Sequence, residues 1–255
     1  MEDTLAPHDA LKLELIRFDV LKVWSVLVTI LGDLAPGERD EIPGPFLSAV
    51  TSRMGIKPEA LRVAIHRLKN DGWVDSRKSG RVRHYQLSAH GRLETQMVRD
   101  RVYGKATDRA GDWHLVLTEA GHRHADALDW IKIRDGAFLV AQYPGPSKDQ
   151  LVSRLNSEQI PIWVLDAICP KDIKTSYEKL AVMLSKFDPA DVPETPIDQV
   201  TLRLLVLHAW RRLILRSNVS AVSAILPEWP GAQTAALVHN LLAHLPRPSL
   251  DGIAR

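Results

Sequence analysis

The chain has only one cysteine, Cys169, among its 255 residues. A single cysteine cannot form an internal disulfide, and this suits the reducing cytoplasm, where we expect the protein to act. The first residues lack the basic start and the apolar core of a signal peptide. The most apolar stretches, residues 20–31 and 202–215, are interrupted by charged side chains, so we predict no membrane span.

The sequence also lacks the short motifs of common enzymes. It contains no G-x-S-x-G, P-loop or G-x-G-x-x-G, so hydrolase, nucleotide triphosphatase and dinucleotide-binding activities have no motif to rest on. A metal site built on His114, His122 and His124 is disfavoured, because the last two fall on a predicted helix and point apart. A nuclease would need a second carboxylate beside Glu119, and none can be placed there. We therefore predict no catalytic site, no cofactor and no metal.

What the sequence does contain is a strongly uneven distribution of charge. The chain as a whole is 45% hydrophobic and 25% charged, with a net charge of only +2. Residues 50–92 hold ten Lys or Arg and three Asp or Glu, which gives +7. Residues 1–49 carry −5, and residues 93–255 hold nineteen charges of each sign. Clustered cations displace counterions from a phosphate backbone, so residues 50–92, the basic segment, are predicted to bind nucleic acid.

The basic segment has the pattern of a helix followed by a hairpin. A helix opens at Pro58 and ends before Gly72, with one apolar face made of Leu61, Ala64, Ile65 and Leu68. Two extended segments follow on either side of a Ser79-Gly80 turn. A shorter helix, residues 45–54, precedes this pattern. Two helices followed by a basic hairpin are typical of a winged helix-turn-helix.

Cationic side chains lie where such a unit would contact DNA. On the predicted helix they face away from the apolar stripe, and on the hairpin they crowd the turn. These residue types donate hydrogen bonds to phosphates and base edges. The candidate DNA-binding residues are Arg62, His66, Arg67, Lys69, Arg77, Lys78, Arg81 and Arg83. The alternative interpretation is a solvated basic helix and hairpin that bind nothing.

The flanking segments predict an α+β protein of several domains. Helices are expected at residues 9–18, at 20–31 with Asp19 as N-cap, and at 88–103 with Ser88 as N-cap. The domains predicted are an N-terminal helix or arm, a winged helix-turn-helix with its linker helix, a middle domain and a helical C-terminal domain. Their expected bounds are 1–18, 19–103, 104–169 and 170–255.

The middle domain has the order of a ferredoxin-like fold. Strands are expected at Trp113–Thr118, at 130–133 with 137–142 around an Asp135-Gly136 turn, and at 160–167. Helices are expected at 120–128 and 147–155. Strand, helix, hairpin, helix, strand is the ferredoxin-like sequence of elements, and an unrelated small α+β domain is the alternative. Beyond it we expect helices at 171–186, 197–215 and from Pro230 to about Leu245.

Three separated pieces of sequence resemble one family. They are LRVAIHRLKNDGWV with GRVRHYQLSAHG in the basic segment, LHAWRRLI at 207–214, and ILPEWPG at 225–231. Together they resemble the PaaX-type family of bacterial transcriptional repressors. The resemblance implies a winged helix, a ferredoxin-like (Cas2-like) middle domain and a helical C-terminal domain. It also implies a dimeric repressor that an aryl-CoA thioester, such as phenylacetyl-CoA, releases from DNA.

Family motifs carry over to particular positions. Arg62 and Arg67 match recognition-helix arginines, and Gly80-Arg81 matches the wing. The C-terminal signature falls on His208, Arg211, Pro227, Trp229, Pro230 and Gly231. The chain departs from the family pattern at residues 216–222, where a Pro-containing stretch is usual, and in the hairpin around Asp135-Gly136, which is shorter and lacks an aromatic-rich segment.

The part after the winged helix lacks a catalytic motif and is predicted to dimerise and to sense a ligand. A CoA thioester needs a cationic site and an apolar slot. The candidate effector-binding residues are His208, Trp210, Arg211 and Trp229. Arg211 and Arg212 point to different faces of one helix, so at most one of them should line a pocket. We predict a ligand-responsive repressor that binds operator DNA as a homodimer. The alternatives are a ligand-independent DNA-binding factor and an enzyme without a recognisable motif.

Overall fold

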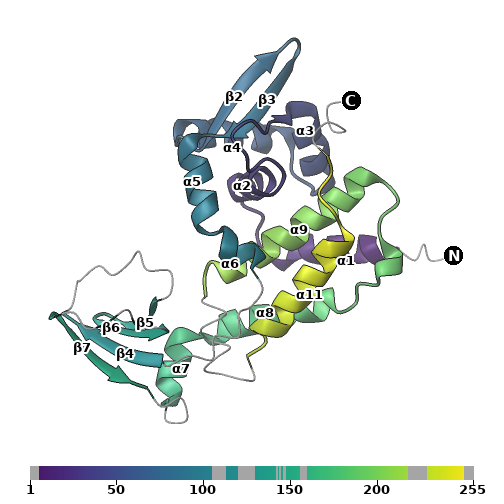
Figure 1. Ribbon diagram of the computed structural model, residues 1–255. Helices are drawn as coiled ribbons and strands as arrows, with labels where there is room; N and C mark the ends of the chain where they lie inside the picture. The colour runs from purple at the N-terminus through teal and green to yellow at the C-terminus, as the bar shows by residue number, and fades with distance from the viewer. Residues whose placement is uncertain are drawn as a thin grey trace. The chain divides into compact units, whose positions relative to one another are not determined.

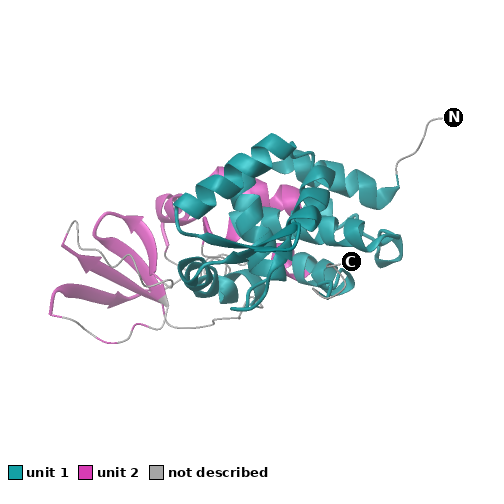
Figure 2. Ribbon diagram, turned by 90° about the horizontal axis from the view of Figure 1, so that it is seen from above, with its two compact units in different colours: residues 1–104, 182–212, 237–255 teal, residues 105–181, 213–236 magenta. Residues whose placement is uncertain are grey.

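The computed structural model describes residues 6–104, 113–119, 130–141, 143, 145, 148–155, 160–217 and 229–249 (Figure 1). The chain divides into two compact units, which Figure 2 colours separately. Unit 1 comprises Met1–Gly104, Val182–Arg212 and Leu237–Arg255. Unit 2 comprises Lys105–Ala181 and Leu213–Ala236. The domain bounds expected from the sequence stay a prediction.

Helices make up most of unit 1. Its first part holds α1 (Pro7–Phe18), α2 (Val23–Leu34), α3 (Gly44–Arg53), α4 (Pro58–Asn70), α5 (Ala89–Met97) and α6 (Arg99–Tyr103). Later come α8 (Lys171–Leu184), the 3-10 turn η2 (Pro189–Asp191), α9 (Pro196–Ile214) and α11 (Gly231–His244). Of these, α8, α9 and α11 each have residues in both units. None of the helices in the described part of the chain is long and apolar enough to cross a membrane.

Two helices of unit 1 are buried on nearly every side. On α2, all residues from Ser25 to Leu31 are buried, and on α9 the same holds from Val200 to Trp210. A helix enclosed by protein must satisfy its polar side chains internally, because an unpaired buried polar group is costly. Thr29 and Thr201 do so by donating to backbone carbonyl oxygens four residues earlier. These two helices therefore form the core on which the other helices of the unit pack.

A small antiparallel sheet adjoins the helices of unit 1. Its order is β1 (Ile42–Pro43), β3 (Val82–Leu87), β2 (Val74–Ser79). The β2–β3 hairpin extends away from α2, α3 and α4 (Figure 1). Two residues, Gly80 and Arg81, connect the strands, and Gly80 has φ 60°. A positive φ at the first turn residue is common to the two-residue hairpin turns of types I′ and II′, and glycine adopts it without strain, so the turn predicted near Ser79-Gly80 is confirmed.

Most of the local predictions for the first hundred residues are confirmed. The expected helices at 9–18, 45–54 and from Pro58 are present as α1, α3 and α4. The N-cap prediction for Asp19 is wrong, since α2 begins at Val23. Asp19 instead pairs with Arg212 at 2.9 Å, a contact between residues far apart in the chain. The single helix expected over 88–103 is broken at Val98 into α5 and α6, while Ser88 caps α5 as predicted.

Unit 2 contains an antiparallel sheet. Its order is β5 (Trp130–Arg134), β6 (Ala137–Ala141), β4 (Trp113–Thr118), β7 (Gln150–Arg154). The predicted hairpin at Asp135-Gly136 is confirmed, with Gly136 at φ 72°. One face of the sheet buries Val116, Phe138 and Val140. On the helical part, the Tyr177 and Trp229 rings pack with centroids 4.9 Å apart, and both side chains are buried.

Two predictions in the middle of the chain are wrong. Residues 147–155 were expected to be a helix, but β7 pairs with β4 along its length. Residues 160–167 were expected to be a strand, but α7 (Ile162–Ile168) is a helix that buries Val164 and Ile168, one turn apart, and packs on β5. The helix expected at 120–128 lies outside the described residues. The α+β class is confirmed, whereas the ferredoxin-like order is not reproduced in its second half.

Candidate nucleic-acid interface

Helix α4 presents a cationic face to solvent because its apolar residues recur every three or four positions. Leu61, Ala64 and Leu68 are buried, and α4 packs on α2 and α3. The opposite side is therefore exposed by helical geometry. The predicted contact residues on this helix are all exposed: Arg62, His66, Arg67 and Lys69. The sequence prediction that these four lie away from the core is confirmed.

These four side chains differ in how firmly the protein holds them. Arg62 lies 3.8 Å from Glu59, and both side chains are about three-quarters exposed. Such an exposed pair contributes little energy, so Arg62 can reorient toward a ligand. Arg67 is held more closely, since it lies 3.5 Å from Asp71 and its guanidinium sits 5.9 Å from the centre of the Trp24 ring.

The remaining two contacts of α4 are short-range. His66 Nδ1 lies 3.2 Å from the Asn70 side-chain amide. Lys69 donates to Ser76 Oγ of β2 at 3.0 Å. Arg83 of β3 donates to the same hydroxyl oxygen at 3.2 Å. Ser76 thus joins the end of α4 to both strands of the hairpin, which brings the helix and hairpin cations onto one part of the molecule.

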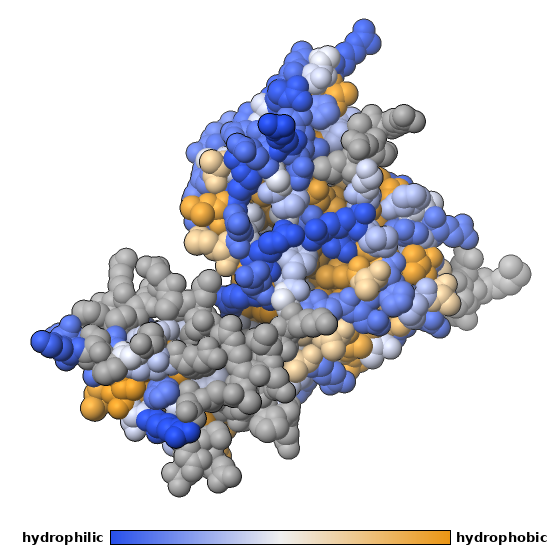
Figure 3. Space-filling model, in the orientation of Figure 1, coloured by the Kyte–Doolittle hydropathy of each residue, from blue (hydrophilic) through white to orange (hydrophobic). Residues whose placement is uncertain are grey.

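The hairpin cations fall into two groups. Arg77 makes two hydrogen bonds to the Glu41 carboxylate, at 2.9 and 2.7 Å, so its charge is already balanced. The pKa of Glu41 is lowered, chiefly because Arg77 hydrogen-bonds the carboxylate. Among the described residues, Lys78 and Arg81 have no carboxylate within ion-pairing distance, and both are exposed beside the turn. Figure 3 shows predominantly hydrophilic side chains over this hairpin.

A close backbone contact fixes the base of the hairpin to α5. Ser88 Oγ donates to Gly72 O at 2.5 Å and accepts from Gly91 N at 3.0 Å. A Cβ atom at Gly91 would lie 2.3 Å from Trp73 O, so only glycine permits this approach. The hairpin is therefore attached rigidly at its base while its cationic turn reaches into solvent. The sequence alone did not identify Gly91. Its role is to leave room for the Trp73 carbonyl, and the neighbouring residues in the sequence do not indicate such a requirement.

A known protein family matches the part of the chain that contains α4 and the hairpin. The family described as PaaX-like protein matches residues 22–91, which span α2, α3, α4 and the hairpin. The chain is similar to the PaaX-like proteins. Transcriptional repressor PaaX of Escherichia coli (strain K12) is 24% identical over 250 residues, which cover 85% of this chain and 78% of that protein. The resemblance recognised in the sequence is confirmed.

The residues carried over from the PaaX-like C-terminal signature lie in different surroundings. His208 is 3% exposed, and its Nδ1 lies 3.0 Å from Thr29 Oγ1. Trp210 is fully buried and donates from Nε1 to Val102 O at 2.9 Å. Both belong to unit 1, whereas Trp229 belongs to unit 2 and packs on Tyr177. An effector role for these three residues stays a prediction.

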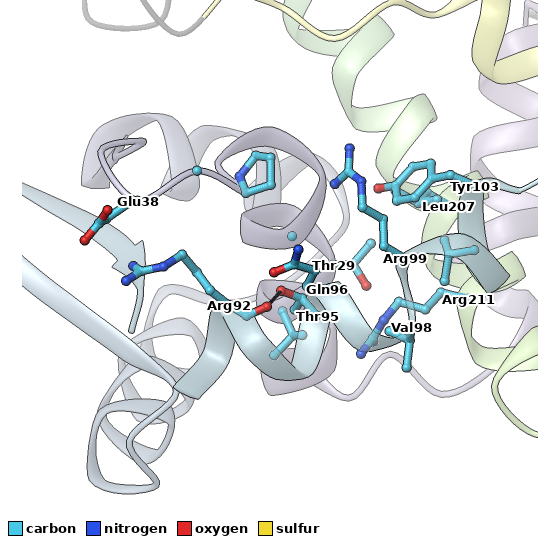
Figure 4. A pocket seen from close by; sticks show the side chains of 15 residues that line it. Thr29, Glu38, Arg92, Thr95, Gln96, Val98, Arg99, Tyr103, Leu207 and Arg211 are labelled. Atoms are coloured by element: carbon cyan, nitrogen blue, oxygen red, sulfur yellow. Dashed lines mark hydrogen bonds between the residues drawn. The ribbon is translucent and has the colours of Figure 1, made fainter. Parts of the chain in front are cut away.

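Arg211, one of the predicted effector residues, lines a cavity together with other arginines. A cavity of about 440 Å³ lies within unit 1, and it is lined by residues of α2, the 36–38 loop, α5, α6 and α9 (Figure 4). Arg92, Arg99 and Arg211 all border it. Arg212 points elsewhere and pairs with Asp19. The two neighbouring arginines therefore point to different faces of α9, as predicted, but the prediction that at most one lines a pocket is wrong, since Arg212 borders a separate small hollow beside Asp19. Arg92 and Arg99 were missed, since residues so far from Arg211 in sequence carry no local signal.

The buried His208 predicts a dependence of stability on pH. Burial, with the nearby cations Arg212 and Arg211, lowers the pKa of His208 from 6.5 to about 4. Between pH 6.5 and about 4, His208 is therefore protonated in the unfolded chain but neutral in the folded chain. We expect the free energy of unfolding to fall by about 3 kcal/mol between pH 6.5 and 4 on account of this side chain.

Urea unfolding at a series of pH values measures this loss. A His208→Gln variant keeps a polar group near Thr29 and cannot be protonated. Its stability should therefore change less between pH 6.5 and 4 than that of the natural protein, while the two slopes agree between pH 7 and 8. Equal slopes for both proteins in the lower range would show that His208 is not the group responsible.

Proposed function

We propose that this protein is a transcriptional repressor that binds operator DNA through α3, α4 and the β2–β3 hairpin, arranged as a winged helix-turn-helix. The observation that carries the proposal is the exposed cationic row of α4, joined through Ser76 to a cationic hairpin. The family match over residues 22–91 and the similarity to the E. coli repressor support it.

In this proposal the cations have separate tasks. Arg62 and His66 face the major groove, where their donors reach base edges and provide sequence discrimination. Lys69, Lys78, Arg81 and Arg83 contact phosphates, as do many basic side chains in DNA complexes. Arg77 is already paired with Glu41 and does not contact DNA, and Arg67 is steadied by Trp24 and Asp71.

We further propose that the repressor acts as a homodimer. A single α4 reads only a few base pairs, whereas two copies about 34 Å apart, or at a multiple of this spacing, read an inverted repeat. The acidic residues 1–49 lend no affinity for DNA. The residues after Tyr103 then serve dimerisation, and an acyl-CoA thioester is the candidate effector.

A ligand-independent DNA-binding factor is the second candidate function. It shares the interface but predicts that no small molecule alters DNA affinity. The cavity beside α5 and α6, with three arginines in its wall, favours the ligand-responsive function.

The test of the interface is the loss of sequence discrimination in an Arg62→Ala variant. We expect the operator affinity to fall by about 1–3 kcal/mol, because a bidentate arginine–base contact has this value. Affinity for unrelated DNA should fall much less, since that binding depends on phosphates. Fluorescence anisotropy with an operator selected from random duplexes and with a scrambled duplex gives both numbers. An equal loss on both duplexes would assign Arg62 to the phosphates instead.

A further inference from the structure

The cavity in unit 1 has the lining of an anion site. Three arginines border it, one each from α5, α6 and α9, against one carboxylate, Glu38. In the view of Figure 4, Arg92 and Glu38 lie at one end, and Arg99 and Arg211 lie at the other. The polar Thr29, Thr95 and Gln96 lie between these ends, and the lining also includes the apolar Val28, Val98, Val102 and Leu207. Cations beside apolar side chains fit a molecule with an anionic group and an apolar body.

The cations at the Arg99 and Arg211 end have no counter-charge among the described residues. Arg211 is half-buried, and this burial lowers the pKa of its guanidinium. Within the described part of the chain, no carboxylate lies within ion-pairing distance of Arg99 or Arg211. Arg99 instead lies over the Tyr103 ring, 5.1 Å from its centre. A desolvated cation without a partner is costly, and an anion entering the cavity relieves that cost.

The same cavity adjoins the attachment of the hairpin. Arg92 lines it and also donates to Leu87 O, the last residue of β3, at 2.7 Å. The break between α5 and α6 at Val98 lies in its wall. A short helix that is anchored to the hairpin at one end and interrupted at the other can tilt as a unit, because the break carries the change in backbone angles.

We propose that this cavity, which we call the arginine pocket, binds a small organic anion with an apolar body, and that occupation moves α5 and with it the β2–β3 hairpin. Binding at Arg99 and Arg211 stands on the cavity alone. The coupling to the hairpin rests on the DNA-binding function proposed above. Two sources offer this chemistry: a free carboxylic acid, and an acyl-CoA thioester, whose phosphates supply the charge.

Calorimetric titration of the full-length protein tests the binding site. The probes are straight-chain and aromatic carboxylic acids of increasing size, their CoA thioesters, and CoA itself. We expect at least one acid or thioester to bind with Kd below 1 mM. The Arg211→Gln and Arg99→Gln variants should each weaken that binding by about tenfold or more, because each loses a charge-assisted hydrogen bond. Arg211→Lys retains the charge and should bind more tightly than Arg211→Gln.

Arg212→Gln is the matched control, since it removes the same charge from the adjacent residue, which lies outside the pocket. It should bind the probe within about threefold of the natural protein. Far-ultraviolet circular dichroism and thermal unfolding confirm that each variant is folded. The proposal is overturned if no probe binds. It is also overturned if Arg211→Gln and Arg99→Gln are both folded and bind the probe as tightly as the control.

The anisotropy of labelled DNA, with and without the bound probe, tests the coupling. Binding of the probe should lower DNA affinity at least fivefold in the natural protein and less in Arg211→Gln. A probe that binds the pocket and leaves DNA affinity unchanged overturns the coupling but not the site. If the protein binds no DNA, the proposed function and the coupling fail together, and the calorimetry still decides the site. If free acids bind, the carboxylate supplies the anionic group. If only the CoA thioesters bind, their phosphates supply it.

Discussion

An Asp33→Asn variant is expected to lose about 3–5 kcal/mol of unfolding free energy. Asp33 is fully buried in α2, and Arg203 of α9 binds its two carboxylate oxygens at 2.7 and 2.9 Å. Arg247 and the Tyr103 hydroxyl each donate to the same carboxylate at 2.9 Å. Asparagine leaves Arg203 buried without a counter-charge, and this is the most damaging way to break such a pair.

The same arginine also holds the end of α11. Arg203 donates to Leu242 O at 3.1 Å and to Leu245 O at 2.7 Å, which are among the carbonyl groups that a helix end leaves unpaired. Loss of its position therefore affects α2, α9 and α11 together. Urea unfolding at pH 7 measures the effect.

The control for this change is Asp9→Asn, which removes a partly exposed carboxylate paired with Lys12. It should cost at most about 1 kcal/mol, as exposed ion pairs do. In a double-mutant cycle, Asp33→Leu with Arg203→Met should cost less than the sum of the two single changes, because the double variant leaves neither member of the pair unmatched. A loss under 1 kcal/mol for Asp33→Asn would contradict this account.

The buried carboxylate also contributes to the response to acid. Burial alone would raise the pKa of Asp33, but the hydrogen bonds and charges of Arg203, with Arg247 and Tyr103, lower it below its ordinary value of 3.8. A lowered carboxyl pKa gives stability that is complete above the ordinary value and is lost as the pH falls through the folded value. As the pH falls, the loss of stability due to Asp33 begins near the pH at which the loss due to His208 ends. The two groups therefore lower the unfolding free energy in successive ranges of pH.

The second large effect is expected for DNA binding when Arg81 and Arg83 are both replaced by glutamine. Each lost phosphate contact lowers the slope of log K against log salt by about 0.9, so the double variant should lose nearly two units of slope. Affinity at fixed salt should fall about tenfold for each contact, because each hydrogen bond to a charged group is lost. The loss should be equal for operator and unrelated DNA, which distinguishes it from the effect of Arg62→Ala.

A charge-matched pair of substitutions on the same hairpin is the control. Arg77→Gln with Glu41→Gln removes an ion pair, leaves the net charge unchanged and should leave the salt slope unchanged within about 0.3. Salt titrations by anisotropy measure all three proteins. If the natural slope survives the loss of Arg81 and Arg83, the hairpin does not contact phosphates.

Local sequence was sufficient to predict the helix and the hairpin of the candidate interface. The spacing of Leu61, Ala64 and Leu68 sets which side of α4 is buried, and so it also sets which side carries the cations. Glycines at 72 and 80, both with positive φ, end the helix and turn the hairpin wherever the rest of the chain lies. These features depend on neighbours within a few residues, and periodicity and turn chemistry report on just such neighbours.

The local sequence did not decide whether short apolar segments form helices or strands. The run IPIWVLDA at 160–167 is rich in β-branched and aromatic residues and was expected to be a strand. It forms α7, a helix that contacts β5 and buries Val164 and Ile168 one turn apart, while Ile162 and Trp163 remain exposed. Conversely, β7 is a strand because β4 offers it an edge to pair with. Such segments fit either periodicity, and the partner surface selects between them.

The pairings that define the core and the pocket were decided by the tertiary structure alone. Asp33 and Arg203 lie 170 positions apart, and either one taken singly resembles an ordinary charged surface residue. Likewise, Arg92, Arg99 and Arg211 share a cavity only because α5, α6 and α9 pack together. By itself the sequence determined α4, the β2–β3 hairpin, their charge and the family resemblance. Only the packing of distant helices decided which charges are buried as pairs and which are left facing a cavity, because burial depends on neighbours that the local pattern does not contain.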